Sequence, residues 1–157
     1  MLSLLSQIVA IFAVLATAVV YGTDMCAVLI MKPVYARLDD ATVTKVAGWG
    51  HFYGDKRMPV PGAGGVVCSI LATVLAMLSG RVPSAIASAV AVAALLAWLV
   101  IYVRVAKPIN TRQTAAAQSG DIPENARELQ DKWESVLGAR VVLQGIAVAA
   151  LCTALAL

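Results

Sequence analysis

The sequence alternates between long apolar stretches and shorter polar connections. Four stretches are almost wholly apolar: Leu2–Met31, Pro59–Ser79, Val82–Ala106 and Ser135–Leu157. Each has at least the roughly 20 residues that an α-helix needs to cross about 30 Å of hydrocarbon. A water-soluble chain would have to surround four such helices with protein, and 157 residues are too few for that. The pattern therefore predicts an all-α integral membrane protein with four spans.

The lengths of the connections predict how these spans are arranged. The second and third stretches are joined by a very short connection, and each span must reverse the direction of the one before it. We therefore expect an antiparallel four-helix bundle that forms one transmembrane domain, residues 1–157. The residue before a proline is disfavoured in helical geometry, so the third helix is expected to end at Lys107–Pro108. No convincing internal repeat is visible.

Two polar segments are predicted to form short helices. Residues 121–134 read DIPENARELQDKWE, with charges at helical spacing. Asp121 is placed to cap this helix and Pro123 to occupy its first turn. The segment predicts a short amphipathic helix that leads into the fourth span. Residues 41–48 (ATVTKVAG) predict a second short helix at the membrane interface.

The composition supports a membrane protein and says little about chemistry. Hydrophobic residues make up 61% of the chain, charged residues only 13%, and the mean hydropathy is +0.84. The three cysteines are scattered singly without a Cys-x-x-Cys pair, which favours small buried side chains over a redox or metal motif. The first apolar run has no basic segment before it and is too long for a signal peptide, so we expect it to be retained.

Basic residues are concentrated in the first and third of the three connections between the stretches. Five lie around each, and the short second connection holds only Arg81. The ten are Lys32, Arg37, Lys45, Lys56, Arg57, Arg104, Lys107, Arg112, Arg127 and Lys132. Because basic residues favour the cytoplasmic side, we expect an inner-membrane protein with both long connections cytoplasmic and both termini external. No basic tract is interleaved with aromatic residues, so a nucleic-acid partner is not expected.

Two ionisable residues lie inside the apolar stretches. Asp24 lies near the cytoplasmic end of the first stretch, and Arg140 enters the fourth from the same side. Charges within a membrane are costly and normally face the bundle interior, so we expect the two to pair. Gln144, one turn beyond Arg140, is placed to add a hydrogen bond. The alternatives are an ion pair that only locks the helices together, or an interfacial carboxylate at position 24.

The connection WGHFYGDKRMPVPG holds the only histidine of the chain, His51. The ordinary pKa of histidine suits proton transfer near neutrality. No Cys or His lies nearby at ligand spacing, so no metal site is predicted and the cofactor is unknown. His51 has two other readings, a single axial haem ligand and a structural residue at the interface. Trp49 and Tyr53 flank it, and both residue types are favoured at membrane interfaces.

The segment KPINTR follows the third stretch and contains Asn110 and Arg112. The amide of Asn110 is both a donor and an acceptor, and Arg112 adds a fixed charge. These two side chains are candidates to bind a polar group of a substrate. The alternative is an ordinary helix end with basic residues on the cytoplasmic side.

Taken in order, four segments resemble the anthrone oxygenase-like family of small four-helix membrane proteins. They are YGTDMCAVLIMKPVY, WGHFYGDKRMPVPGAGG, KPINTR and DKWESVLGAR, and together they cover nearly the whole chain. The best-known members oxidise an anthrone to an anthraquinone with molecular oxygen. These oxygenases have a His–Gly pair before the second helix, where this chain reads GDKRM. The resemblance implies that the recurring family positions are Trp49, Tyr53, Asn110, Arg112, Trp133 and Arg140.

Two functions follow as hypotheses. The first is a membrane oxidoreductase that acts on a lipophilic, aromatic or quinone-like molecule. In that case His51 or Asp24 is the base, while Arg140, Arg112 or Asn110 stabilises the oxyanion and Trp49, Tyr53 and Trp133 stack on a flat ring. The second is a non-catalytic transporter or assembly subunit. A homo-oligomer is expected in either case, because small residues abound in the first and fourth helices.

Overall fold

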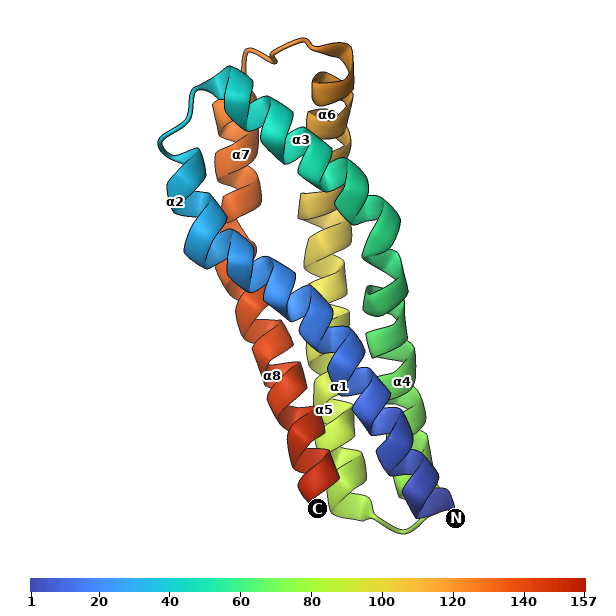
Figure 1. Ribbon diagram of the computed structural model, residues 1–157. Coiled ribbons are helices and arrows are strands. Elements are labelled where there is room, and N and C mark those ends of the chain that lie inside the picture. The colour runs from blue at the N-terminus through green and yellow to red at the C-terminus, as the bar shows by residue number, and fades with distance from the viewer.

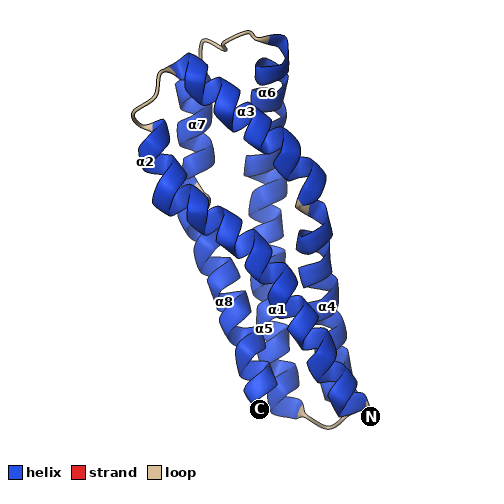
Figure 2. Cartoon of the chain, viewed as in Figure 1, coloured by secondary structure: helices blue, strands red, loops and turns tan.

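The computed structural model describes all residues, Met1–Leu157, and contains helices but no strands (Figures 1 and 2). The α-helices are α1 (Leu2–Cys26), α2 (Lys32–Tyr35), α3 (Asp40–Arg57), α4 (Pro59–Leu78), α5 (Val82–Ile101), α6 (Lys107–Ser119), α7 (Ala126–Ser135) and α8 (Leu137–Ala156). Two π-helical turns, η1 (Ala27–Met31) and η2 (Tyr102–Ala106), interrupt this series. The prediction of an all-α chain is confirmed.

Four continuous helical segments are long and apolar enough to cross a membrane, as the hydrophobic pattern predicted. They are Leu2–Tyr35, Pro59–Leu78, Val82–Ser119 and Ala126–Ala156. The main bundle consists of α1, α4, α5 and α8, in which each helix packs against two others. Both chain ends and the α4–α5 turn lie at one end of the bundle, and α3, α6 and α7 lie at the other (Figure 1). We call the latter the connection end. The antiparallel four-helix bundle is confirmed.

The interior of the bundle is built from small residues and its outside from large ones. Ala13, Ala91 and Ala147 are fully buried where the main helices meet, whereas Phe12 and Leu71 are exposed. Small side chains let helices approach closely, and large apolar side chains that face outward are suited to contact with lipid. This distribution is the reverse of a water-soluble bundle, and it agrees with four membrane spans.

The third helix does not end at Lys107–Pro108, so that prediction is wrong. It continues through η2 into α6 and ends at Ser119, where Gly120 adopts a positive φ of 81°. A proline in a regular helix lacks the N–H for one bond and clashes with the preceding turn. The wider π-turn immediately before Pro108 relieves this conflict. The first helix crosses Pro33 in the same way, because η1 directly precedes Lys32.

The two predicted short helices exist with different bounds. The segment predicted at 41–48 is part of the longer α3, which reaches Met58 at the start of α4. The amphipathic helix before the fourth span is confirmed as α7, but Asn125 precedes its first residue, not Asp121. Pro123 lies in the turn before it. Residues 120–125 are needed to reverse the chain between α6 and α7, so they cannot also extend α7.

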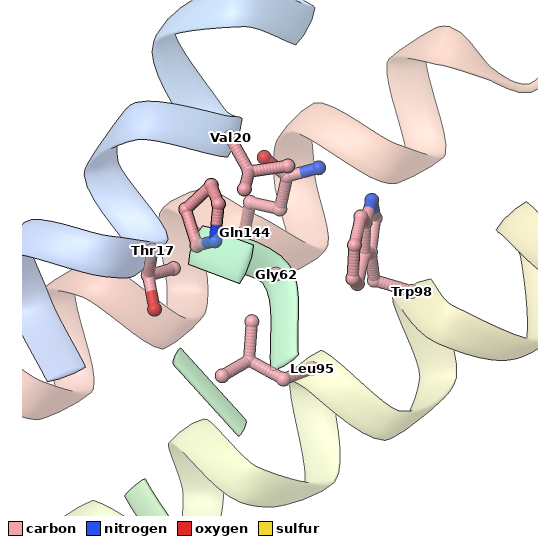
Figure 3. Close-up of a pocket in the computed structure, with 7 residues that line it drawn as sticks. Thr17, Val20, Gly62, Leu95, Trp98 and Gln144 are labelled. Carbon is pink, nitrogen blue, oxygen red and sulfur yellow. The ribbon is translucent and has the colours of Figure 1, made fainter. Parts of the chain in front are cut away.

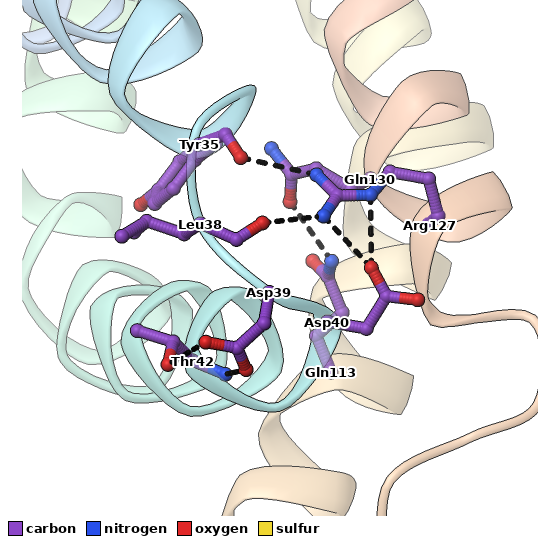
Figure 4. Close-up of polar contacts among 8 residues, drawn as sticks. All are labelled: Tyr35, Leu38, Asp39, Asp40, Thr42, Gln113, Arg127 and Gln130. Carbon is purple, nitrogen blue, oxygen red and sulfur yellow. Dashed lines mark hydrogen bonds and ion pairs between the residues drawn. The ribbon is translucent and has the colours of Figure 1, made fainter.

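Arg127 of α7 fixes the connection between α2 and α3 (Figure 4). Its Nε and Nη2 atoms lie 3.0 and 2.7 Å from the Asp40 carboxylate, and Nη1 and Nη2 donate to the carbonyls of Tyr35 and Leu38. Asp39 caps α3 by accepting from Thr42. The connection end therefore has a defined geometry although it lies outside the main bundle.

The two halves of the chain repeat one order of elements, although no repeat is evident from the hydrophobic pattern. In each half, a long helix passes through a π-turn directly before a Lys-Pro pair, and a shorter helix follows. A single residue then separates this shorter helix from the next span. Residues 55–67 (DKRMPVPGAGGVV) and 131–143 (DKWESVLGARVVL) are identical at six positions when aligned. In this alignment Arg140 stands opposite Gly64. An arginine at this position of the repeat is therefore found only in the second half.

The close approach of α3 and α6 yields a test of the fold. A Cβ atom at Gly48 would overlap the backbone oxygen of Gln113 and the side chain of Ala117. We expect Gly48→Ala to lower the free energy of unfolding by about 1–3 kcal/mol, as overpacking does. Gly50→Ala on the same helix meets open space and is expected to be neutral or stabilising by up to about 1 kcal/mol. Unfolding of both variants in detergent checks this, and equal stabilities would contradict the packing of α3 on α6.

Candidate functional site

The buried centre of the site is an ion pair between the first and last helices. Arg140 Nη2 of α8 donates to Asp24 Oδ1 of α1 at 2.8 Å, and Gln144 Nε2 donates to Asp24 Oδ2 at 2.6 Å. Asp24, Arg140 and Gln144 are only 3%, 6% and 0% exposed. The contact predicted from the depth of these residues in their spans is confirmed. Both carboxylate oxygens have a partner, as burial of a charge requires.

The guanidinium of Arg140 is only partly used by this pair. Its Nε and Nη1 atoms are buried and have no hydrogen-bond partner in the protein. Its Cζ atom lies 5.6 Å from the ring centroid of Trp133 and 6.0 Å from that of Tyr102. The indole Nε1 of Trp133 is also buried without a partner. Three nitrogen atoms thus keep their N–H groups unpaired beside two aromatic rings, an arrangement able to bind an oxygen of a flat ligand.

Further aromatic side chains extend this arrangement on both sides. Tyr102 stacks on Trp98 with centroids 6.0 Å apart and planes inclined by 17°. On the other side, the imidazole of His51 lies 4.9 Å from the Trp133 ring. Five residues on five elements therefore contact one another in a continuous series. In order they are Trp98 of α5, Tyr102 of η2, Arg140 of α8, Trp133 of α7 and His51 of α3. We call these five residues the aromatic–arginine cluster.

Asp55 is the second carboxylate of the site. Its Oδ1 accepts hydrogen bonds from Tyr102 Oη at 2.8 Å and from Asn110 Nδ2 at 2.9 Å. Asn110 was predicted to lie at the site, and the structure places it there with its Oδ1 unpartnered. Asp55 and Tyr102 were not predicted, because a carboxylate in a polar connection and a tyrosine near a span end are both common. Their spacing within the chain gave no sign that they meet.

His51 is a neutral imidazole at pH 7. Burial lowers its pKa from 6.5 to about 4, and the charge of Arg140 acts in the same direction, while the nearby Asp55 carboxylate opposes the shift. Its Nε2 atom has no hydrogen-bond partner. A neutral imidazole can accept a proton, so His51 stays a candidate base. The prediction that His51 titrates near neutrality is therefore wrong, because burial disfavours its charged form.

Three of the predicted site residues lie apart from the aromatic–arginine cluster. Trp49 and Tyr53 are exposed on α3 and pack on Phe52 between them. Arg112 is exposed on α6 and forms no hydrogen bond or ion pair. The helical phase explains the separation on α3, since His51 faces the bundle while residues two positions before and after it face outward.

Polar contacts continue from the cluster toward the connection end. Gln113 Nε2 of α6 donates to Gln130 Oε1 of α7 at 3.0 Å, and Gln130 Nε2 donates to Glu134 at 2.9 Å. Gln113 and Gln130 both appear in Figure 4 beside the Arg127 contacts. Gln113 Oε1 is buried and unpartnered. A buried polar layer therefore joins α6 and α7 between the aromatic–arginine cluster and the connection end.

Two cavities border the site. A small one of about 10 Å³ lies on the bundle axis, between Gln144 and Trp98 (Figure 3). Its other lining residues are Thr17, Val20, Pro61, Gly62 and Leu95. It has room for one water-sized molecule. A larger groove of about 330 Å³ lies between α3 and α6 and is lined in part by Asp55. Only the groove has the volume of a drug-sized ligand, and Arg140, Trp133 and His51 do not line it.

No group of three or more His, Cys, Asp or Glu side chains gathers at metal-binding geometry. The three cysteines are free, and the prediction that they are buried is wrong, because Cys26 and Cys152 are exposed and Cys68 is half-buried. His51 is the one imidazole of the chain, and its ring lies against Trp133.

Comparisons of the chain with protein-family models, with curated proteins and with solved structures find no match. The likeness to the anthrone oxygenase-like family therefore stays a prediction from the motifs. The fold and the site define a small four-span helical protein with a buried ion pair and an aromatic–arginine cluster at one end.

The neutral state of His51 predicts a specific pH dependence of stability. As the pH falls below 6.5, the unfolded chain takes up a proton on this residue, and the folded protein does so only near pH 4. The unfolded state then binds more protons, so the free energy of unfolding falls between pH 6.5 and 4, by at most about 3 kcal/mol. We expect His51→Gln to lose this part of the pH dependence. Unfolding of both proteins in detergent from pH 7 to pH 4 measures it, and parallel curves would contradict the burial of His51.

Proposed function

We propose that the chain is a membrane-embedded oxidoreductase, similar to anthrone oxygenases, that acts on a lipophilic aromatic or quinone-like molecule. The observation that carries the proposal is the guanidinium of Arg140. It holds Asp24 with one nitrogen, and its Nε and Nη1 atoms keep their N–H groups buried and unpaired beside the rings of Tyr102 and Trp133. Aromatic rings favour a flat ligand, and the free N–H groups favour its oxygen.

The contacts assign different roles to the charged groups. Both oxygens of Asp24 are occupied by Arg140 and Gln144, so Asp24 is a positioning residue for the guanidinium. His51 has a buried Nε2 without a partner, so it is the candidate base, and its lowered pKa makes it a weak base at pH 7. Arg140 then stabilises the negative charge that develops on the substrate oxygen.

The reaction is balanced with molecular oxygen as the oxidant. His51 takes a proton from the activated CH₂ group of an anthrone-like ring, and the electron pair of the broken C–H bond stays on the ring as an enolate. The enolate carbon binds O₂, and the resulting peroxide takes up a proton and loses water, which leaves a second ring carbonyl. One ring molecule and one O₂ thus become one quinone and one water, with His51 returned to its neutral state.

We also propose that this site faces the cytoplasmic side of the inner membrane. Ten of the twelve basic residues belong to the segments around the two long connections, and these connections form the connection end. Basic segments are retained in the cytoplasm. The site therefore lies where a lipophilic substrate can enter from the bilayer and protons can exchange with cytoplasmic water.

The orientation predicts which residues react with a membrane-impermeant reagent. A single cysteine at Gly120, in a chain whose Cys26, Cys68 and Cys152 are replaced by alanine, is expected to be labelled only after the cells are opened. A cysteine added after Leu157 is expected to be labelled in intact cells. Labelling of Gly120→Cys from outside would reverse the orientation and move the site to the external face.

The role of Arg140 is tested by Arg140→Lys in purified protein. Lysine keeps the charge for Asp24 but loses the planar set of N–H donors. With an anthrone as substrate, we expect oxygen consumption per enzyme to fall about 10²- to 10³-fold, with the unfolding temperature little changed. Arg112→Lys, an exposed arginine on α6, is the matched control and should turn over like wild type.

Two outcomes would contradict the proposal. Undiminished turnover in Arg140→Lys would remove the guanidinium from the reaction. Absence of oxygen consumption by the wild type with anthrones and related hydroquinones would favour the non-catalytic alternative, in which the same polar cluster serves transport or assembly.

A further inference from the structure

The groove between α3 and α6 lies outside the main bundle and is lined largely by polar side chains. Its volume is about 330 Å³, and its lining includes Phe52, Lys56, Thr111 and Thr114 together with Asp55. Lys56 is exposed and rests over the Phe52 ring at 3.9 Å. Polar lining at the connection end makes this groove accessible to water, unlike the bundle interior.

Asp55 is the residue that joins this groove to the buried cluster. Its carboxylate lines the groove and also accepts the hydroxyl of Tyr102 at 2.8 Å. Tyr102 in turn packs on Trp98 and lies under the guanidinium of Arg140. Asp55 also follows His51 by four residues on α3, so the two side chains lie on the same face of the helix.

We propose that Asp55 is the proton-exchange residue of the site, through which protons pass between water in the groove and the half-buried side chains of His51 and Tyr102. Its role in turnover rests on the proposed function, whereas its role in proton exchange does not. Asp55 is a positioning and relay residue, because it contacts Tyr102 and Asn110 and no atom of the proposed reacting centre.

The charged and titratable groups around Asp55 fit this role. His51 and Lys56 face it from α3, Tyr102 faces it from η2, and Arg140 acts on both His51 and Tyr102 from α8. A base that has taken a substrate proton must release it before the next turnover. A protonated His51 inside the aromatic–arginine cluster has Arg140 on one side, which disfavours its charge, and Asp55 on the side of the groove, which favours it. The proton therefore leaves toward Asp55, which passes it to water.

The single histidine makes the exchange measurable without any turnover. In protein labelled with ¹⁵N-histidine, the only ring signals come from His51. We would measure the rate at which its ring N–H exchanges with water at pH 7 in detergent micelles. Asp55→Asn keeps the shape and an acceptor for Tyr102 but removes the ionisable group, and we expect it to slow the exchange at least about tenfold.

The repeat provides a matched control. Asp131 occupies the corresponding position of the second half, is exposed and forms no hydrogen bond or ion pair, so Asp131→Asn should leave the exchange unchanged. An unchanged rate in Asp55→Asn, or an equal slowing in Asp131→Asn, would overturn the proposal. Should Asp55→Asn fail to fold, Ala115→Phe fills the groove from its exposed wall. An unchanged rate in that variant would overturn the proposal in the same way.

The two proposals fail separately. Slow exchange in Asp55→Asn combined with a wild type that consumes no oxygen would keep the relay and remove the oxidoreductase. Oxygen consumption that Asp55→Asn leaves at the wild-type rate, with unchanged exchange at His51, would keep the oxidoreductase and remove the relay.

Discussion

The structure depends on the burial of one carboxylate, Asp24, within the first helix. A charge in this position requires a permanent partner, and Arg140 and Gln144 of the last helix bind both of its oxygens. Removing one member of such a buried pair typically costs about 3–5 kcal/mol, because the other charge is then left unpaired. The pair therefore fixes the register of α1 against α8 and brings the two ends of the chain together in one bundle.

The same interaction creates the site. A guanidinium has five N–H donors, and a carboxylate held partly by Gln144 cannot occupy them all. The remaining N–H groups of Arg140 are directed among Tyr102 and Trp133, where no protein oxygen meets them. Unpartnered donors in a buried place are costly in a purely structural element. Their presence beside aromatic rings is the observation that favours the proposed site over an ion pair that only holds helices together.

Periodicity and depth predicted much of this arrangement. Apolar length identified the four spans, and the equal depth of Asp24 and Arg140 predicted their contact. Two kinds of feature were not predicted. The third span continues past Pro108 because the π-turn before it accommodates the proline ring. Local sequence preferences do not predict such a turn. Asp55 joins Tyr102 across 47 positions of the chain, and only the packing of α3 on the third span brings them together.

The helical phase accounts for the residues that did not gather. Trp49, His51 and Tyr53 are close in sequence and were grouped for that reason, yet a helix turns the middle one inward and the other two outward. A loop at this place would have left all three free to face the site. The family resemblance assigned Trp49 and Tyr53 recurring positions, and the structure places these side chains on the outside of α3.

The energetic coupling of Asp24 with Arg140 tests the central claim most directly. A double-mutant cycle of Asp24→Asn and Arg140→Gln, read from the free energy of unfolding in mixed micelles, compares this pair with the exposed pair Asp40–Arg127. We predict a coupling of at least about 2 kcal/mol for the buried pair and about 0–1 kcal/mol for the exposed one. The double variant should also be more stable than either single variant of the buried pair. Additive effects of Asp24→Asn and Arg140→Gln would contradict the account, because the two charges would then not depend on each other.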